Sequence, residues 1–251
     1  MAQVALVSDI HANLEACEAV LADIASRGIE EILCLGDVIG YGPNPRECLE
    51  RAYDFEFSLL GNHEEAVLYY ADDFNDKARQ AIEWTKEQLN SSRFSKESNY
   101  QIWNYLDGMQ RSKVWNDTLL VHASPRKPTK EYLLPQDVND PDKLRAVFDA
   151  MDQSLCFCGH SHVPGVYTDD LKFVPSRELE EGYRPDERRC IVNVGSVGQP
   201  RDGDTRACYV TYDGEVIRFV RVEYDFSQTM EKIRGIEALP NFLADRLSRG
   251  K

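Results

Sequence analysis

Five short segments of this chain each carry an apolar run that ends in residues able to bind a metal ion. All five histidines of the 251-residue sequence lie in these segments, which are residues 4–11, 32–37, 57–64, 119–122 and 155–162. Imidazole and carboxylate groups are ligands for divalent transition metals, and histidines scattered through a core or over a surface would not be distributed in this way. The sequence therefore predicts one metal-dependent site that is assembled from five places in the chain.

The segment 32–42 shows how one of these positions is built. Residues 32–35 are apolar without alternation, which predicts a strand buried on both faces. Gly36 then permits a close approach of backbone or ligand, and Asp37 falls at the carboxyl end of the strand, where ligands of α/β sheets collect. A Gly-Asp pair alone is also typical of an ordinary turn, so the prediction depends on the five segments together.

The five segments resemble the motifs of the calcineurin-like metallophosphoesterases. That family has, in order, Asp-x-His, Gly-Asp, Gly-Asn-His-Glu/Asp, a later His and Gly-His-x-His. The corresponding positions here are Asp9 and His11, Gly36-Asp37, Gly61-Asn62-His63-Glu64, His122, and Gly159-His160 with His162. The match covers roughly residues 4–200, and five motifs in order are specific although each alone is weak. The sequence around them is most similar to a small bacterial branch with diadenosine tetraphosphatase-like and phosphodiesterase proteins.

The resemblance implies a dinuclear centre with two divalent transition-metal ions (Mn, Fe, Ni or Zn). Asp37 would bridge the two ions. Asp9, His11 and His162 would complete the first site, and Asn62, His122 and His160 the second. The residue types agree with this assignment, because a carboxylate can bind two cations and the lack of cysteine ligands argues against a closed structural zinc site.

The resemblance also implies the reaction, which is hydrolysis of a phosphoester by in-line attack of a hydroxide that bridges the metals. His63 would protonate the leaving oxygen or donate a hydrogen bond to the phosphoryl group, and Asp9 would orient it. Arg201 follows the glycine-rich residues 193–200 and is either a phosphate-binding residue or a solvated surface arginine. A metal-rich, positive pocket in an acidic protein favours a small phosphorylated substrate over a polymer.

Some of these residues also have ordinary structural interpretations. A histidine such as His122 at the end of an apolar strand is often a hydrogen-bonded core residue, and Asn62 is of a type common in turns. For Glu64 we expect a role as an acidic residue at a helix N-terminus, favoured by the helix dipole, rather than as a catalyst.

Three functions are compatible with the motifs: a metal-dependent phosphodiesterase or nucleotide hydrolase, a protein Ser/Thr phosphatase acting on monoesters, and a non-catalytic scaffold. Protein phosphatases of this superfamily typically carry Gly-Asp-x-Val-Asp-Arg-Gly, but residues 38–42 here contain no arginine. Scaffold relatives usually lose the histidine that is present here as His63. We therefore expect the first function.

Composition restricts the partners and the location. The chain has 29 basic and 43 acidic residues, a net charge of −14, so long nucleic acids and anionic membranes are expected to be poor partners. Apolar stretches stay below the ~18 residues of a membrane span, and Asp9 interrupts the first apolar run. The seven cysteines lack paired CxxC spacing and are expected to be reduced thiols. These features predict a cytoplasmic protein; they do not indicate an oligomeric state.

The order of predicted elements gives the fold class. Strands alternate with helices in the first half, and mostly adjacent strands follow, which predicts an α+β or α/β fold. We expect a four-layer αββα sandwich of two mixed sheets flanked by helices, in a single domain of residues 1–251. The resemblance implies the same sandwich.

Several local predictions accompany this fold. Residues 100–109 are expected to be a short helical or irregular piece, residues 123–138 a loop, and the polar segment 168–189 a hairpin or flap beside the site. Asn44 is predicted to cap a helix that begins at Pro45. Asp213-Gly214 is predicted to form a two-residue hairpin turn.

Overall fold

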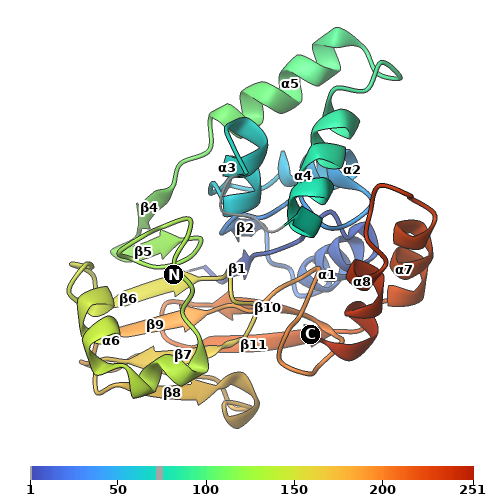
Figure 1. Ribbon diagram of the computed structural model, residues 1–251. Helices are drawn as coiled ribbons and strands as arrows, with labels where there is room; N and C mark the ends of the chain where they lie inside the picture. Colours follow the sequence, from blue (N-terminus) through green and yellow to red (C-terminus); the bar gives the residue numbers. More distant parts are fainter. Residues whose placement is uncertain (1, 72–75) are drawn as a thin grey trace.

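The computed structural model describes residues 2–71 and 76–251. Two mixed β-sheets pack face to face, and helices cover their outer faces (Figure 1). This arrangement confirms the predicted four-layer sandwich of two mixed sheets. Among the described residues, no helix combines the length and the apolar character needed to cross a membrane.

The first sheet has five strands in the order β11-β10-β1-β2-β3. Its strands are β1 (Val4–Val7), β2 (Glu31–Cys34), β3 (Phe57–Ser58), β10 (Ala207–Tyr212) and β11 (Ile217–Val222). Strands β1, β2 and β3 are parallel, whereas β10 pairs antiparallel with both β1 and β11. Helices α1 (Leu14–Ser26) and α2 (Pro45–Ala52) connect the parallel strands, as βαβ crossovers require.

The second sheet has six strands in the order β4-β5-β6-β9-β7-β8. Its strands are β4 (Ser112–Trp115), β5 (Thr118–Val121), β6 (Leu155–Cys158), β7 (Gly165–Thr168), β8 (Lys172–Pro175) and β9 (Cys190–Asn193). Strands β5, β6 and β9 are parallel, and the hairpins β4–β5 and β7–β8 form the two edges.

The remaining helical elements lie on the outside of the sheets (Figure 1). They are α3 (Asn62–Leu68), α4 (Asp76–Leu89), α5 (Lys96–Asp107), α6 (Pro141–Phe148), α7 (Phe226–Arg234) and α8 (Phe242–Asp245), with short 3₁₀ helices η1 (Pro135–Asn139), η2 (Ser176–Glu178) and η3 (Leu247–Arg249).

Separate apolar cores hold the layers together. Inner-face side chains of both sheets, including Leu6, Leu33, Phe157 and Val192, form the core between the sheets. Outer-face side chains of the first sheet pack against α1 and α2, and those of the second sheet pack against α6. Because β1, β6 and β9 are covered on both faces, they appear in the sequence as nearly continuous apolar runs.

Some local predictions need correction. Helix α5 begins at Lys96 instead of residue 100, because Ser95 caps it by accepting a hydrogen bond from the Ser98 amide (3.2 Å). The 123–138 loop ends in the 3₁₀ helix η1, which begins at Pro135. Helix α2 starts at Pro45 as predicted, but the Asn44 side chain donates to Glu47 and forms no cap with the helix backbone.

The β10–β11 turn is longer than predicted. Tyr212 pairs with Ile217, so four residues rather than two connect the strands. The Asp213 carboxylate accepts hydrogen bonds from the amides of Glu215 (2.9 Å) and Val216 (2.7 Å), and this stabilises the wider loop. The acidic residues Asp72-Asp73, for which the sequence predicts a break between two helical stretches, lie outside the described residues.

Candidate metal centre

The predicted ligand residues all follow the carboxyl ends of parallel strands. Strands β1, β2 and β3 of the first sheet, and β5 and β6 of the second, lead into the loops that carry them. Ligands of α/β proteins collect at this end of a sheet. The structure brings the histidines and carboxylates together in overlapping groups, within each of which the ligand atoms lie within 4.8 Å of one another.

These loops leave the strands through left-handed backbone conformations. Asp9, His11, Asp37, His160 and His162 have φ values between 49° and 65°, which are uncommon for residues other than glycine. Backbone hydrogen bonds hold two of the loops side by side: the Asp9 amide donates to Gly36 (3.0 Å) and the His11 amide to Asp37 (2.9 Å). Strained backbone of this kind clusters at functional sites.

Asp9, His11 and His162 form the first group of the cluster. The Nε2 atoms of His11 and His162 lie 3.1 Å apart. Asp9 Oδ1 lies 3.0 Å from Nε2 of His162 and 3.6 Å from Nε2 of His11. The second carboxylate oxygen of Asp9 accepts a hydrogen bond from the His160 amide (2.9 Å). One carboxylate oxygen and two ring nitrogens therefore face one another.

Asp37, Asn62, His122 and His160 form the second group. His122 Nε2 lies 3.0 Å from Asn62 Oδ1 and 3.1 Å from His160 Nδ1. It also lies 3.3 Å from Asp37 Oδ2, and this same oxygen is 3.8 Å from His11 Nε2 in the first group. Asp37 is thus placed between the two groups.

Backbone carbonyls orient three of the four histidines in the two groups. The contacts join Nδ1 of His11 to the Ile39 carbonyl (3.3 Å), Nδ1 of His122 to that of Leu35 (3.1 Å) and Nδ1 of His162 to that of Gln199 (2.6 Å). Because a carbonyl oxygen can only accept, each ring carries a proton on Nδ1 and directs Nε2 toward the centre of the cluster. Histidines that bind metals commonly have such an outer hydrogen bond.

His160 is held in a different way. Its Nδ1 faces the cluster, and its buried Nε2 has no hydrogen-bond partner among the described residues. The ring of Tyr132 stacks on it, with the ring centroids 3.9 Å apart. The position of His160 therefore depends on aromatic packing instead of an outer hydrogen bond.

The donor atoms fit a divalent transition metal. With Nδ1 protonated on both rings, the Nε2 lone pairs of His11 and His162 face each other at 3.1 Å and repel unless a cation lies between them. Asp9 Oδ1 is fully buried and has no hydrogen bond to any described residue. Imidazole nitrogens and carboxylate oxygens without thiolates suit Mn, Fe, Ni or Zn.

The electrostatics of the cluster favour positive charge at its centre. Burial works against ionisation of Asp37, but the neighbouring His122, His63 and His11 together outweigh it and hold the pKa of Asp37 below its usual range. Burial also disfavours the charged form of His122, yet Asp37 raises the pKa of His122 to about 9. Burial and the charge of His122 lower the pKa of His160 to about 3, so this ring stays neutral and can bind a metal.

His63 lies beside the first group. Its backbone amide donates to Asp37 Oδ1 (2.9 Å), and its ring packs edge-on against His11 and Tyr41, with ring centroids 4.9 Å and 4.3 Å away. Burial lowers the pKa of His63 well below its usual value. Gly40 is required here, because its φ is +88° and a side chain would collide with the His63 ring. The carboxylate of Asp9 is directed at His11 and His162, so its predicted orientation of His63 stays a prediction.

Glu64 has a role that the sequence analysis only partly foresaw. It lies in the first turn of α3, as predicted. Its fully buried carboxylate also accepts hydrogen bonds from the amides of Asp37 (2.8 Å), Gly61 (3.0 Å) and Ile39 (3.1 Å). Burial and the charge of Asp37 raise the pKa of Glu64 to about 7. The side chain thus fixes the loop that carries Asp37. Of its three contacts, only the one with Gly61, three residues earlier in the chain, could have been predicted from the sequence.

A shallow depression, called the cavity below, lies over the cluster. Its walls contain ligand candidates and His63, together with Arg201, Tyr41 and Tyr132. Arg201 therefore lines the cavity, and its predicted role in binding a phosphate stays a prediction. The tyrosines were not predicted, since nothing in the spacing of Tyr132 links it to His160. The segment 168–189 contains β8, which pairs with β7 in a hairpin, and η2. Its predicted position beside the site needs correction, because none of its residues lines the cavity.

Comparisons with known proteins agree with the fold. The sequence profile of the calcineurin-like phosphoesterase superfamily domain matches residues 2–215. An uncharacterized protein of Methanocaldococcus jannaschii is 40% identical over 99% of this chain and 98% of its own length. The solved structure of a metallophosphoesterase from Sphaerobacter thermophilus is 36% identical, with a TM-score of 0.82 over 99% of both chains.

A hypothetical protein of Pyrococcus horikoshii shares the fold at 20% identity, with a TM-score of 0.77 over 100% of this chain and 99% of its own. The family profile spans every ligand candidate described above. This chain therefore belongs to the calcineurin-like phosphoesterase superfamily and is a metal-dependent phosphoesterase.

Proposed function

We propose that this protein is a dinuclear-metal phosphodiesterase or nucleotide hydrolase. The observation that carries the proposal is the pair of ligand groups with Asp37 between them, 3.3 Å from His122 and 3.8 Å from His11. In this proposal Asp9, His11 and His162 hold the first ion, Asn62, His122 and His160 hold the second, and Asp37 binds both. When bound, the ions lower the pKa of a water molecule and neutralise charge on the phosphoryl oxygens.

The other residues of the cavity act on the substrate directly. His63 lies outside the two ligand sets assigned above, although its ring nitrogen is within 4.8 Å of ligand atoms of His11 and Asp37. We assign it the proton that the leaving oxygen requires. Burial lowers the pKa of His63, so this role requires the negative phosphoryl group of the substrate to raise that pKa. Arg201 binds a phosphoryl oxygen, because its Nε is buried without a hydrogen-bond partner while Nη2 is fixed by Gln199 (2.8 Å). Glu64 keeps Asp37 in position through the backbone.

A preference for diesters is supported by the loop after Asp37. Residues 38–42 contribute Tyr41 to the cavity wall and no guanidinium. A monoester brings nearly two negative charges to the site and a diester one, so a cavity with fewer cationic side chains is better suited to the diester. Monoester hydrolysis is the alternative that the experiment distinguishes.

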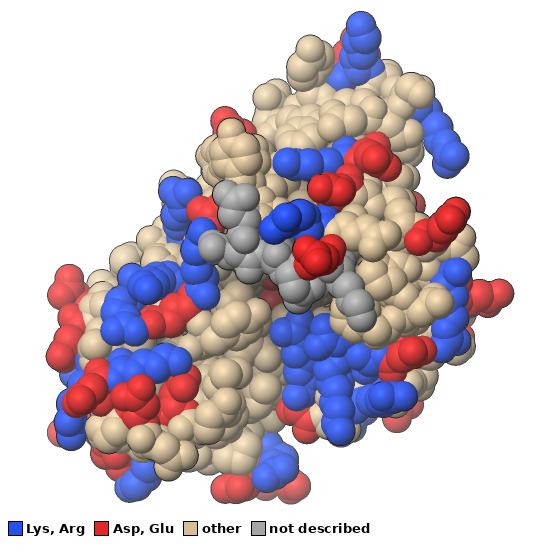
Figure 2. All heavy atoms as spheres, viewed as in Figure 1, with Lys and Arg blue, Asp and Glu red and all other residues tan. Residues whose placement is uncertain are grey.

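We also propose that the substrate is a small molecule and that the protein acts in the cytoplasm as a single domain, residues 1–251. The net charge of −14 disfavours long polyanions. On the face shown in Figure 2, Lys and Arg side chains nevertheless gather over the C-terminal segment of the chain, near α8. All seven cysteines are buried and unpaired, which suits a reducing compartment.

The test uses metal-free protein reconstituted separately with Mn, Ni, Zn or Mg. Hydrolysis of bis(p-nitrophenyl) phosphate, p-nitrophenyl phosphate and diadenosine tetraphosphate is measured for each metal. We expect metal-dependent turnover with a higher kcat/KM for the diester. A monoester preference of about tenfold or more would identify a phosphatase instead. Binding of metal without hydrolysis of any ester would indicate a scaffold.

A further inference from the structure

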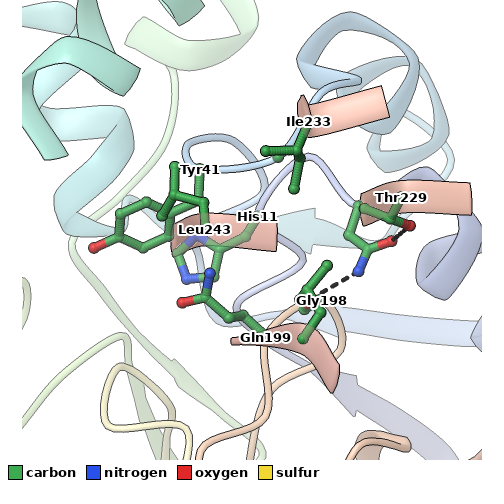
Figure 3. A pocket seen from close by; sticks show the side chains of 10 residues that line it. His11, Tyr41, Gly198, Gln199, Thr229, Ile233 and Leu243 are labelled. Carbon is green, nitrogen blue, oxygen red and sulfur yellow. Dashed lines mark hydrogen bonds between the residues drawn. The ribbon is translucent and has the colours of Figure 1, made fainter. Parts of the chain in front are cut away.

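The C-terminal segment, residues 224–251, lies outside the part of the chain that the family profile matches, yet it packs against the loops of the candidate metal centre. Leu243 of α8 belongs to an apolar cluster that Tyr41 also contacts. Figure 3 shows Tyr41 lying over His11 beside Leu243, in a small pocket whose opposite wall carries Thr229. The segment therefore lies against the first ligand group.

Asn13 connects this segment to the ligand loops. Its buried side chain makes four hydrogen bonds, which is the full capacity of an amide group. Asn13 Oδ1 accepts from the backbone N–H of Ala16 (3.2 Å), at the start of α1, and from the Thr229 hydroxyl of α7 (2.9 Å). Asn13 Nδ2 donates to the Gly198 carbonyl (2.8 Å) and to the Tyr224 hydroxyl (3.2 Å). Two of the four partners thus belong to the C-terminal segment.

These partners fix the orientation of the Asn13 amide group. The backbone N–H of Ala16 can only donate and the Gly198 carbonyl can only accept, so Oδ1 must face α1 and Nδ2 must face Gly198. Thr229 shares its one hydroxyl proton between Asn13 Oδ1 and Glu15 Oε2 (2.8 Å). The hydroxyl is therefore held from two sides, and it supports the orientation in which Asn13 donates to Gly198.

Gly198 is the point at which Asn13 acts on the neighbouring loop. A side chain at this residue would collide with the Ile10 carbonyl, so the close approach requires glycine. Because glycine leaves its own dihedral angles free, side chains have to fix the peptide plane between Gly198 and Gln199. Asn13 holds the carbonyl end of this plane, and the Ser196 hydroxyl accepts a hydrogen bond from the Gln199 amide at the other end (2.8 Å).

The same peptide plane determines the direction of the next carbonyl, that of Gln199. Pro200 follows, and a proline restricts the residue before it to extended conformations, so the Gln199 carbonyl has little freedom of its own. This carbonyl accepts the hydrogen bond from Nδ1 of His162 (2.6 Å). It thereby directs Nε2 of His162 toward Asp9 Oδ1 (3.0 Å) and His11 Nε2 (3.1 Å).

We propose that Asn13 is a positioning residue for the first metal ion, and that Thr229 of the C-terminal segment holds it in the required orientation. The hydrogen bonds run from α7 through Asn13 and the peptide plane after Gly198 to the ring of His162. This inference rests on the proposed function, because it uses the ligand set that is assigned there to the first ion. It adds the C-terminal segment to the parts of the chain that determine metal affinity.

The test separates positioning from helix capping. Serine caps helices as well as asparagine does, so Asn13→Ser keeps the cap of α1, but its shorter side chain cannot reach the Gly198 carbonyl. Thr229→Val removes the hydroxyl at nearly constant shape, and Thr229→Ser keeps the hydroxyl. The control is Ser95→Ala, which removes the cap of α5, a helix that contributes no residue to the cavity.

Each of these substitutions is made in the wild-type protein and in the His160→Ala and His162→Ala proteins. We expect the first of these two backgrounds to retain the first metal site and the second background to retain the second site. The affinity of the metal-free proteins for Zn is measured by competition with a chelator, and their melting temperatures are measured without metal. The two backgrounds show at which site an affinity changes.

We expect Asn13→Ser to weaken Zn binding roughly tenfold at the first site, which is the lower end of the range for partners of metal-binding histidines, and less than about twofold at the second. Thr229→Val should weaken the first site by roughly two- to fivefold, and Thr229→Ser should match the wild type. Ser95→Ala should lower the melting temperature and leave both affinities unchanged.

Equal losses at the two sites, or no loss at the first, would overturn the proposal. It would also be overturned if the affinities followed the melting temperatures in every variant, including Ser95→Ala. If Asn13→Ser does not fold, the pair Thr229→Val and Thr229→Ser decides in the same way, because both variants keep Asn13.

The two proposals fail in different ways. If the wild-type protein hydrolyses phosphodiesters and both Asn13→Ser and Thr229→Val bind the first ion as tightly as the wild type does, only the positioning role is wrong. If no ester is hydrolysed with any metal but these variants still lose the first ion selectively, the positioning role stands and the assignment as a diesterase or nucleotide hydrolase is wrong. A wild-type protein that binds no Zn would overturn both.

Discussion

The two halves of the proposed metal centre are held by different forces. In the first half, the rings of His11 and His162 are both fixed by hydrogen bonds to backbone carbonyls. In the second half, His122 has such a bond but His160 depends on stacking with the partly exposed Tyr132. Hydrogen bonds restrict ring rotation more than stacking does, so the first half is better preorganised for a metal. We expect the second half to be the weaker and more adjustable metal site.

The largest effect is expected from Asp37→Ala, which should remove both halves of the metal centre and not one of them. Asp37 is near both halves, so Asp37→Ala should empty both sites, and metal content should fall from about two equivalents to almost none. Loss of the metal chemistry, worth several kcal/mol, should lower kcat by roughly 10⁴ or more. Metal analysis and diester hydrolysis measure the two effects. Asp142→Ala, which changes a solvent-exposed carboxylate on α6, is the control. A variant that keeps one full equivalent would show that Asp37 does not bridge.

His63→Gln separates catalysis from metal binding beside the first half. Both ions should remain bound, because His63 belongs to neither of the two ligand sets that we propose. Turnover should fall by roughly 10²–10⁴, with a smaller effect on KM, because the leaving oxygen loses its acid. The loss should be smaller for nitrophenyl esters, whose leaving groups hardly need a proton. Loss of a metal ion, or unchanged turnover of a diester with a poor leaving group, would show that the assigned role is wrong.

Stepwise removal of metal addresses the difference between the halves directly. Outer hydrogen bonds change metal affinity by roughly 10–100-fold, so a chelator titration should release one equivalent before the other. His160→Ala should abolish the weaker step, and His162→Ala the tighter one. Simultaneous release of both equivalents would contradict the difference that we infer from the ring contacts.

The smallest effect is expected from Tyr132→Ala, which removes the ring that stacks on His160. Tyr132→Ala should weaken metal binding in the second half by roughly 2–10-fold, the range expected for the loss of one aromatic pair. Tyr132→Phe keeps the ring and serves as the matched control. Affinity is measured by metal titration of both variants. If the two variants behave alike, the hydroxyl group or the loop, and not the ring, determines the position of His160.

The sequence predicted those features that depend on the order and spacing of residues along the chain. Asp9, His11, Asp37 and the other ligand candidates stand at fixed places after apolar strands, so motif spacing identified them. The contribution of Glu64 was partly visible, since it lies three residues after the glycine that precedes α3. The sandwich followed from the order of strands and helices.

Other parts depend on contacts between residues far apart in the chain. Tyr132 reaches His160 and Thr229 reaches Asn13, without any repeated spacing that would connect them. The turn at Asp213 was predicted with the wrong length because its side chain, and not its backbone preference alone, determines the loop. Sequence patterns therefore predicted the candidate metal ligands better than they predicted the other residues around the cavity.

The left-handed backbone at the ligand loops links metal binding to folding. Each such residue other than glycine costs on the order of 1 kcal/mol relative to an ordinary conformation, somewhat less for Asp and His. Ala12, with φ of +52°, has no side chain that could compensate for this cost. The metal-free chain bears the cost in full, and an ion that binds only the folded loops shifts the folding equilibrium by mass action. The melting temperature should therefore rise with the concentration of free metal.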